Sequence, residues 1–346
     1  MNPRIEDVAR AAGVSIATVS RVMNNDAHAV RAATRRRVEE AVRKLHYRPN
    51  IFARGLMKGT TNSVGVIVPF LSNPYHTEIV DAVVEALVRH DVFVYLCCSY
   101  ARTELEQEYV RSLGHRRVDA LIVVESPSFN SRPRPGRGPG LDAYALPGQP
   151  TILVNEHLAT EVSHHIVRCA QEPGILQALD RFRSRGRRRV ALFRGGASYS
   201  FDLKERLFER FRRDGGLSAS ENPVVRIRNA NDPRAVHDSA VHIGELLRGA
   251  YPPTAVLASN DLIALGVVQG ALAAGARVPD DLAIISVDNT IVSQFSRPPL
   301  SAVDLRPTTV GQAAARVYLD LRAHGFHSAA PIRRTIDAQL IIRESG

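Results

Sequence analysis

Apolar residues in the first 25 positions of the chain recur at helical spacing in two short blocks. The first block repeats at i, i+3, i+4 and i+7, one apolar stripe of a short helix, and consists of Ile5, Val8, Ala9 and Ala12. Gly13 interrupts this stripe where a tight turn needs a residue that tolerates a positive φ. Ser15 is a good N-cap for a second helix, whose inward-facing positions are Val19, Val22 and Met23. The pattern predicts two short helices joined by a glycine turn.

A third amphipathic block follows a polar, alanine-rich stretch at residues 26–33. Thr34 is a candidate N-cap, and the apolar stripe behind it consists of Val38, Ala41, Val42 and Leu45. The second helix turns a different set of residues away from its apolar face, namely Ile16, Ala17, Ser20, Arg21 and Asn24. Three short helices, of which the second exposes small side chains and one arginine, are typical of a helix-turn-helix domain that presents a recognition helix to DNA.

Residues 47–60 join this small domain to the rest of the chain. Pro49 ends the helical domain, Asn50 can cap one or two further turns, and Gly59 stops them. An isolated helix of this length is marginal in water, and Gly55 costs it about 1 kcal/mol more. From the residues alone, the segment is interpreted as a plain linker.

From residue 64 onward, short apolar runs alternate with amphipathic blocks. The runs predict strands at residues 64–68, 92–98, 118–124, 151–154, 165–167, 190–193, 224–228, 254–258, 282–287 and 335–342. The blocks predict helices at residues 75–89, 103–115, 174–185, 202–213, 234–247, 261–274 and 310–323. Such alternation predicts parallel sheets whose two faces are both covered by helices. We expect two doubly wound parallel-sheet α/β lobes, with ligands bound between them beyond the carboxyl ends of the strands.

The net charge of +10 is concentrated near the N-terminus of the chain. Residues 1–62 contain 12 Lys and Arg against 5 Asp and Glu, so the remaining 284 residues carry a net charge of only +3. A basic head on a nearly neutral body predicts a polyanionic partner for the head alone.

Cysteine usage and short motifs exclude several classes of protein. Cys97, Cys98 and Cys169 show neither disulfide nor metal-ligand spacing, and the adjacent pair lies in an apolar run, where we expect buried strand thiols. The first 20 residues lack the apolar region of a signal peptide, and no run of 18 apolar residues could span a bilayer. The sequence has no phosphate-loop, dinucleotide-binding or zinc-protease motif. We expect a cytoplasmic protein that is not an enzyme and holds no metal or cofactor.

Residues 7–9 (Asp-Val-Ala), 12–15 (Ala-Gly-Val-Ser) and 18–22 (Thr-Val-Ser-Arg-Val) closely resemble the DNA-binding head of the lactose-repressor (LacI/GalR) family of bacterial transcription regulators. Residues 254–266, 278–289 and 298–303 resemble the core of the same family. The resemblance implies a helix-turn-helix domain at residues 1–48 and a hinge helix at 49–62 that folds on operator DNA. It also implies a periplasmic-binding-protein-like core at 63–346, with one lobe from about 63–157 and 291–323 and the other from about 158–290 and 324–346.

The same resemblance implies a nucleoid-associated regulator, usually a repressor, that binds double-stranded operator DNA as a homodimer on a pseudo-palindrome. The residues expected to contact bases are Ile16, Ala17 and Arg21, since arginine can bond guanine bidentately and apolar groups can contact thymine methyls. The residues placed for the DNA backbone are Thr18, Ser20, Asn25, His28 and Tyr47. The minor-groove hinge residues are Asn50, Ala53, Arg54 and Leu56, of which Leu56 would wedge between base steps.

In the core, the residues expected to contact a sugar-like small-molecule effector are Tyr75, His76, Arg194, Arg206, Asp261 and Asp288. Asp261 stands at a strand-to-helix junction, where a carboxylate either binds a hydroxyl-rich ligand or caps the helix. Arg206 keeps the place of the arginine that holds the effector in the family, and Arg168 and Arg194 add positive charge. A cleft with these three arginines would suit an anionic ligand, such as a phosphorylated or acidic sugar.

Other segments leave alternatives open. Residues 126–150 combine proline, glycine and arginine where the family carries a helix, which fits either a surface loop or an arginine-rich contact to DNA or a partner. Residues 167–170 and 206–210 depart from the family pattern. The cleft is therefore either a working effector site or a vestigial one in a regulator that answers to a protein partner. A pure ligand-binding receptor of the same fold is a further alternative, against which the basic head argues.

Overall fold

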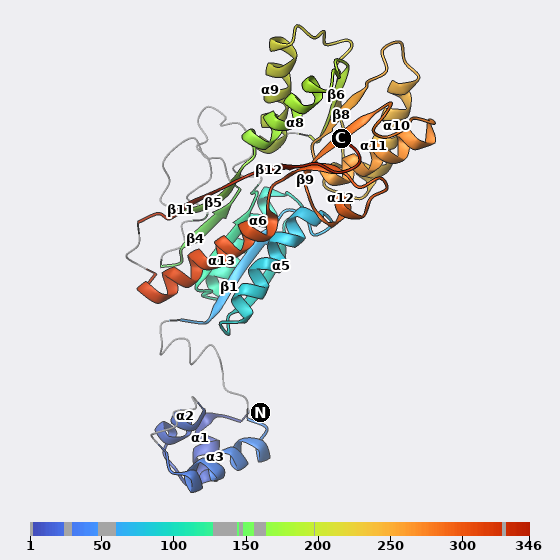
Figure 1. Cartoon of the computed structure of the whole chain (residues 1–346). Helices are drawn as coiled ribbons and strands as arrows, with labels where there is room; N and C mark the ends of the chain where they lie inside the picture. The colour runs from blue at the N-terminus through green and yellow to red at the C-terminus, as the bar shows by residue number, and fades with distance from the viewer. Residues whose placement is uncertain are drawn as a thin grey trace. The chain divides into compact units, whose positions relative to one another are not determined.

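The computed structural model describes residues 3–23, 30–47, 60–126, 144, 148–155, 164–196, 198–326 and 330–346. The chain divides into two compact units, a head at Met1–Thr61 and a core at Asn62–Gly346 (Figure 1). Each unit has its own apolar interior, and each is described here by itself.

The head contains the three helices that the apolar pattern predicts: α1 (Ile5–Ala12), α2 (Ile16–Met23) and α3 (Ala32–Lys44). Gly13 follows α1 with φ of 63°, the left-handed conformation that the turn requires. Ser15 accepts a hydrogen bond at 3.2 Å from the backbone N–H of Thr18, as an N-cap does. The third helix begins at Ala32, before the expected cap at Thr34. Val8, Val19 and Val38, one from each helix, are fully buried and hold the three helices together.

The first lobe of the core is built on a six-stranded sheet of order β11-β5-β4-β3-β1-β2, in which all neighbours are parallel. Its strands are β1 (Ser63–Val68), β2 (Phe93–Cys98), β3 (Ala120–Val124), β4 (Thr151–Val154), β5 (His165–Ala170) and β11 (Arg333–Asp337). Its helices are α5 (Pro74–Val88), α6 (Thr103–His115) and α13 (Pro307–His324), and α13 packs along α5.

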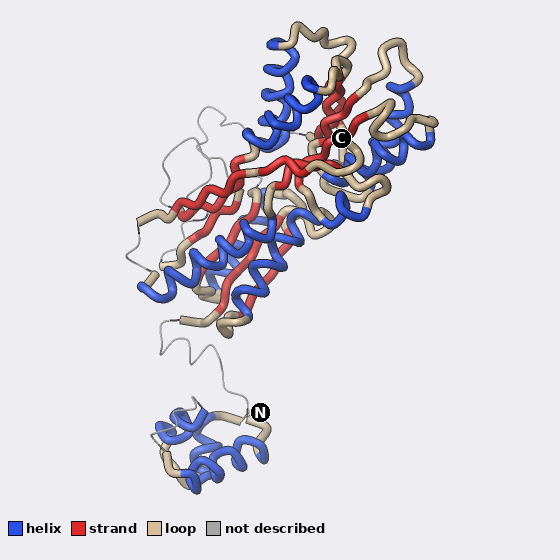
Figure 2. The backbone as a smooth tube through the Cα atoms, viewed as in Figure 1, coloured by secondary structure: helices blue, strands red, loops and turns tan. Residues whose placement is uncertain are grey.

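The second lobe is built on a six-stranded sheet of order β12-β10-β9-β8-β6-β7, parallel except for the antiparallel pair β10–β12. Its strands are β6 (Val190–Arg194), β7 (Val224–Arg226), β8 (Ala255–Ala258), β9 (Ala283–Asp288), β10 (Ser301–Asp304) and β12 (Gln339–Ile341). Its helices are α8 (Glu172–Ser184), α9 (Tyr199–Asp214), α10 (Arg234–Leu247), α11 (Asp261–Ala273) and α12 (Ile291–Phe295). In both lobes helices cover the strands (Figure 2), which confirms the predicted doubly wound α/β architecture.

The division into lobes differs from the expected boundaries. Strand β5, expected to open the second lobe, lies in the sheet of the first, and β10 lies in the sheet of the second. The strand expected at residues 335–342 is two strands, β11 and β12, that belong to different sheets. The chain therefore passes between the lobes after β5, after β10 and between β11 and β12.

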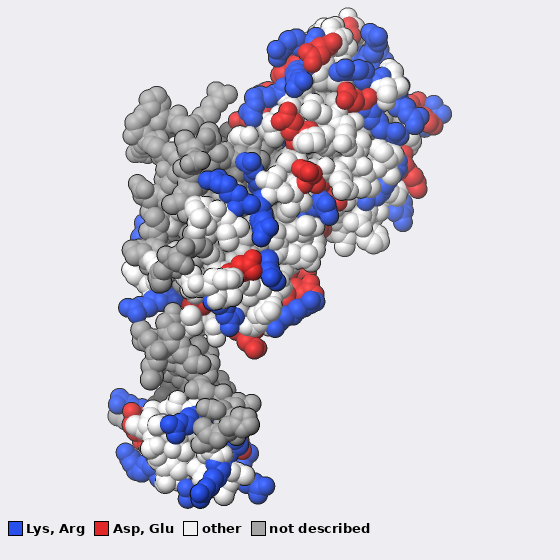
Figure 3. All heavy atoms as spheres, turned by 60° about the vertical axis from the view of Figure 1, so that its left-hand side comes forward, with Lys and Arg blue, Asp and Glu red and all other residues white. Residues whose placement is uncertain are grey.

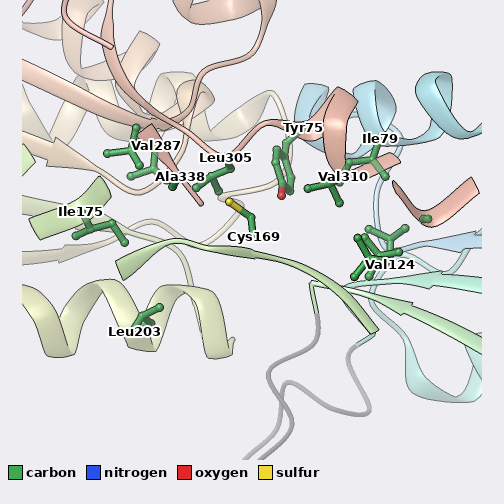
Figure 4. Packing of buried hydrophobic residues seen from close by; sticks show 14 of the residues in the cluster. Tyr75, Ile79, Val124, Cys169, Ile175, Leu203, Val287, Leu305, Val310 and Ala338 are labelled. Carbon is green, nitrogen blue, oxygen red and sulfur yellow. The ribbon is translucent and has the colours of Figure 1, made fainter. Parts of the chain in front are cut away.

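One apolar cluster runs through these crossings. It joins Tyr75 and Ile79 of α5 in the first lobe to Ile175 of α8 and Leu203 of α9 in the second. Cys169, Leu305 and Ala338, one from each crossing, lie together at its centre (Figure 4). Because the two lobes share this interior, the core is one compact unit rather than two independent domains.

Strand β2 corrects a further expectation. Its predicted burial does not hold, because β2 is the last strand in the sheet order and its only partner among the described strands is β1. The side chain of Phe93 is 62% exposed, and Cys97 and Cys98 are only half-buried. Of the three thiols, only Cys169 is fully buried, and burial raises its pKa to about 12.

Candidate functional site

The exposed face of α2 carries the residues expected to read DNA bases. Ile16, Ala17 and Arg21 are exposed, while Val19 and Val22 on the opposite face are buried in the head. The side chain of Ile16 is 45% exposed, an apolar group left in water on an otherwise polar helix face. Figure 3 shows that Lys and Arg predominate over Asp and Glu on the visible face of the head. This combination of positive charge with a projecting helix suits a DNA groove.

The residues expected to contact the DNA backbone are placed less uniformly. Thr18 and Ser20 are half-buried beside the base-reading positions, and the hydroxyl of Thr18 lies 2.9 Å from that of Ser15. Tyr47 packs against the apolar interior of the head, and burial raises the pKa of its phenol. The other expected DNA contacts lie outside the described residues, and these are Asn25, His28, Asn50, Ala53, Arg54 and Leu56.

A cavity of about 400 Å³ lies in the core between the two sheets. Its walls come from the carboxyl ends of strands in both lobes: Phe70 follows β1, Glu125 follows β3, Ser259 follows β8, and Asp288 ends β9. This is where doubly wound α/β folds bind their ligands. The volume suits a small molecule of one or two sugar rings.

The wall from the first lobe carries Tyr75 and His76, as the sequence predicts. Nδ1 of His76 lies 3.2 Å from the carbonyl oxygen of Phe70, and Nε2 lies 3.3 Å from Oε2 of Glu125. Both neighbours are acceptors, so both ring nitrogens donate only when the imidazole carries two protons. His76 and Glu125 therefore form a charge-balanced pair at the cavity wall.

Tyr75 is held beside this pair. Its hydroxyl accepts a hydrogen bond at 2.6 Å from Nδ2 of Asn155, and burial raises the pKa of the phenol well above its usual value. The oxygen of the same Asn155 side chain accepts from the backbone N–H of Cys169 at 2.9 Å. Tyr75 is thus tied to the first crossing between the lobes.

The wall from the second lobe carries a cation that the sequence analysis missed. Lys204 of α9 lines the cavity with its side chain 2% exposed, and its Nζ donates to Oγ of Ser200 at 2.8 Å. Burial lowers the pKa of Lys204, and the charge of Asp288 opposes this shift. One signal was available in the sequence: Lys204 is one of only three lysines in a chain whose cations are otherwise arginines.

Asp288 lines the same cavity, as the sequence predicts. It is 5% exposed and has φ of 118°, a strained conformation for a residue other than glycine. Burial, with the nearby charge of Asp261 adding to it, raises its pKa well above the usual value, while Lys204 opposes the shift.

The expected arginine cluster is not assembled. Arg194 is buried at the end of β6, where its guanidinium pairs with Asp202 at 3.0 Å and with Glu205, and donates to the carbonyl of Gly195 at 2.9 Å. Arg206 is exposed, with its guanidinium 5.5 Å from the centre of the Tyr199 ring. Arg168 faces Thr335 of β11, with 3.5 Å between Nε and Oγ1. None of these arginines lines the described cavity.

Asp261 takes neither of the two roles considered for it. Asn260 is the N-cap of α11, since its Oδ1 accepts from the N–H of Ile263 at 2.9 Å. Both carboxylate oxygens of Asp261 accept internal hydrogen bonds, from Oγ of Ser286 and from the N–H and Oγ1 of Thr290 at 2.6 and 2.7 Å. Asp261 therefore braces the turn between β9 and α12, while Asn260 lines the cavity.

Three hydrogen bonds join the lobes beside the cavity. At one side Oγ of Ser72 donates to the carbonyl of Asn231 at 3.2 Å, and Nδ2 of Asn73 donates to Oδ1 of Asn231 at 3.0 Å. At the other, Oε1 of Glu78 accepts from the N–H of Ile291 at 3.0 Å. These bonds hold the lobes against each other across the cavity.

Two negative findings apply to the part of the chain that the structure describes. No cluster of three or more His, Cys, Asp or Glu side chains there could hold a metal ion. None of the helices there is both long and apolar enough to cross a membrane.

Comparisons with known proteins agree with this arrangement. Residues 4–50 match the family model of bacterial regulatory proteins, lacI family, and residues 179–346 match that of the periplasmic binding protein-like domain. The HTH-type transcriptional repressor PurR of Aliivibrio fischeri (strain MJ11) is 30% identical over 320 residues, 91% of this chain and 90% of that protein.

Solved structures are similar over the whole length. A complex of the transcriptional regulator CelR with cellobiose shares 26% identity with a TM-score of 0.68, over 99% of this chain and 100% of that one. A lac repressor dimer bound to operator and an anti-inducer shares the fold, with a TM-score of 0.82 at 23% identity over 100% and 99% of the two chains. The helix-turn-helix head, the two-lobed core and these similarities lead to one conclusion: the chain belongs to the lacI family of bacterial regulatory proteins, as a DNA-binding transcription regulator with a periplasmic-binding-protein-like core.

Proposed function

We propose that the protein is a repressor that binds a pseudo-palindromic operator as a homodimer and changes its affinity for that operator when a small sugar-like effector occupies the cavity of the core. The observation that carries this proposal is the pairing of two surfaces in one chain. The head projects a helix with Ile16, Ala17 and Arg21 exposed, and the core encloses a polar cavity between lobes.

The DNA-binding part of the proposal rests on the chemistry of α2. Arg21 can donate two hydrogen bonds to one guanine, and the exposed apolar side chain of Ile16 can contact a thymine methyl. The positive charge of the head supplies affinity for phosphates without regard to sequence. A two-fold dimer would then read two half-sites about one helical turn apart.

The homodimer is supported by apolar side chains that the core leaves exposed. On β2 and just after it these are Phe93, Leu96 and Tyr100, and on α12 they are Ile291 and Phe295. An edge strand with exposed apolar side chains is a surface that proteins normally cover. The similar lac repressor structure is a dimer on its operator.

The effector is proposed to bind among Tyr75, His76, Lys204 and Asp288. All four are buried and line the cavity, and they come from both lobes. A ligand that touches both walls stabilises the closed arrangement that Asn231 and Glu78 already favour. The similar CelR structure contains cellobiose, a neutral sugar. An anionic effector is not favoured, because Arg194 is already paired with acids and Arg206 lies outside the cavity.

Selection of bound sequences from random double-stranded DNA by the full-length protein tests the proposal. We expect a palindrome with a fixed centre, and specific binding that weakens with salt in proportion to the phosphates contacted. A matched Arg21→Ala variant should lose about 10- to 100-fold in affinity for the selected sequence, the cost of one bidentate base contact. Recovery of no motif, with binding that disappears at moderate salt, would contradict the proposal.

A further inference from the structure

The cavity contains a buried cation and a buried carboxylate that do not satisfy each other. Lys204 and Asp288 both line it from the second lobe, and both are at least 95% buried. Nζ of Lys204 has one hydrogen-bond partner among the described residues, Oγ of Ser200. Within the same described part of the chain, the carboxylate of Asp288 has none, and no ion pair within 4.0 Å joins it to Lys204.

Such a gap specifies the chemistry of what fills it. A buried charge without partners is unfavourable, so a ligand that completes its hydrogen bonds is strongly selected. The ligand must accept from the ammonium of Lys204 and, on a neighbouring atom, donate to the carboxylate of Asp288. A hydroxyl group can do either, and two hydroxyls on adjacent carbons can do both without any change in charge.

The other charged groups of the cavity are already balanced. His76 pairs with Glu125, and Arg234 pairs with Asp232 at 2.9 Å. Arg228, also in the wall, is exposed to solvent, where its charge is screened. The buried part of the described cavity thus has no surplus positive charge for a ligand carboxylate or phosphate.

We propose that Lys204 and Asp288 together recognise two neighbouring hydroxyl groups of an uncharged carbohydrate, so that Lys204 is the residue of α9 that determines which effectors the cavity accepts. The inference rests on the proposed effector site and names its ligand class.

The protonation of the pair gives the proposal a second signature. The charges that act on Lys204 are Asp288, Glu125 and Arg194, and those that act on Asp288 are Asp261, Lys204, Glu125 and Glu78. Burial lowers the pKa of Lys204 and raises that of Asp288, so each group is charged mainly because of the other. A diol leaves this balance unchanged. A carboxylate would favour protonation of Asp288, and its binding would take up a proton.

Calorimetric titration of the full-length protein with neutral sugars and their uronic acids tests the ligand class. Suitable pairs are D-glucose with D-glucuronate and D-galactose with D-galacturonate, supplemented by neutral pentoses and disaccharides. We expect at least one neutral sugar to bind, with the same heat in phosphate and Tris buffers because no proton is exchanged. Binding by uronates alone, by none of the neutral sugars, or with buffer-dependent heat would overturn the proposal.

Variants of α9 test the residue. Lys204→Met is expected to weaken binding of that neutral sugar about 10- to 100-fold, the usual effect of losing a hydrogen bond to a charged group. Arg206→Met is the matched control, because it removes a cation two residues further along the same helix but outside the cavity. Equal affinities for the sugar in Lys204→Met and wild type would overturn the role of Lys204.

Nuclear magnetic resonance keeps the test independent of how well Lys204→Met folds. The chain has three lysines, Lys44, Lys58 and Lys204, so protein labelled with ¹³C at the lysine ε-carbon gives three signals. Lys204→Arg assigns the signal of Lys204. We expect saturating neutral sugar to shift that signal and to leave the other two in place, and an unshifted Lys204 signal would overturn the proposal.

Failure of this inference is distinguishable from failure of the proposed function. Sequence-specific DNA binding by wild-type protein without sugar tests the regulator alone. If it is present while Lys204→Met binds the sugar normally, only the role of Lys204 is wrong.

Discussion

At the scale of single residues, α9 shows how helix geometry chooses between two cations. Successive residues of an α-helix are turned by about 100°, so side chains two positions apart point in nearly opposite directions. The buried side chains that fix the inward face of α9 are Leu203, Leu207, Phe208 and Phe211. With that face fixed, Lys204 faces the cavity and Arg206 faces solvent. A family motif that placed the cation at Arg206 could not show this.

The sequence predicted other cavity residues for a simple reason. Tyr75, His76 and Asp288 stand at or just beyond the ends of predicted strands, and such positions meet between the lobes in this fold. Arg194 also ends a strand, but Asp202 and Glu205 of the following helix fold back and neutralise it. That pairing depends on how α9 packs, which the sequence pattern does not contain.

His165 yields a prediction about pH. Its Nδ1 accepts from the backbone N–H of Ile332 at 3.1 Å, and burial, with His164 adding to it, lowers its pKa below the usual 6.5. The unfolded chain therefore binds a proton more readily than the folded one, and stability is lost as pH falls below about 6.5. We expect the melting temperature to fall between pH 7.5 and pH 5.5, and His165→Gln to reduce that fall by roughly 2 °C.

The exposed His237 provides the control for this measurement, because His237→Gln removes a titrating group without touching the β5–β11 contact. If both variants keep the full pH-dependent fall of the wild type, His165 does not carry the effect.

At the scale of elements, the sequence predicted what each segment forms better than where it belongs. Helices α6 and α10 have the predicted bounds, because each has a long apolar stripe. Strand β10 was missed because only Ser301–Asp304 form it, with a proline-rich stretch before and another proline soon after. The crossing at Ala338 was missed because β11 and β12 read as one strand and separate only through pairing with different sheets.

The crossing of α10 and α11 yields a prediction about stability. A Cβ on Gly270 would lie 2.3 Å from the carbonyl oxygen of Ala240, a backbone atom that cannot move aside cheaply. We expect Gly270→Ala to destabilise the core by about 1–3 kcal/mol, the cost of overpacking, as measured by urea unfolding.

Gly244→Ala on α10 is the matched control. Its Cβ would meet only Nη1 of Arg248 at 3.6 Å, and alanine favours a helix by about 1 kcal/mol over glycine. A Gly270→Ala variant as stable as Gly244→Ala would show that the two helices do not pack this closely in solution.

At the scale of the whole molecule, the account needs a path from the cavity to DNA. The core is one unit with a shared interior, and the chain leaves it toward the head through residues 49–62, most of which lie outside the described part. We propose that this segment is the hinge at which occupancy of the cavity changes DNA affinity.

Leu56→Ala tests the hinge. If Leu56 wedges into the minor groove at the operator centre, the variant should lose at least about 10-fold in affinity for the selected operator and little for random DNA, since non-specific binding is mainly electrostatic. Met57→Ala, which changes the neighbouring apolar residue, is the control. Equal losses on both DNAs would contradict a wedge.

The most direct test of the account is the affinity of the full-length protein for its selected operator with and without the neutral sugar that binds the core. An allosteric regulator is expected to show a change of roughly 5- to 150-fold, in either direction, and Lys204→Met should abolish that change while leaving the sugar-free affinity intact. An operator affinity that is identical with and without saturating sugar would contradict the account.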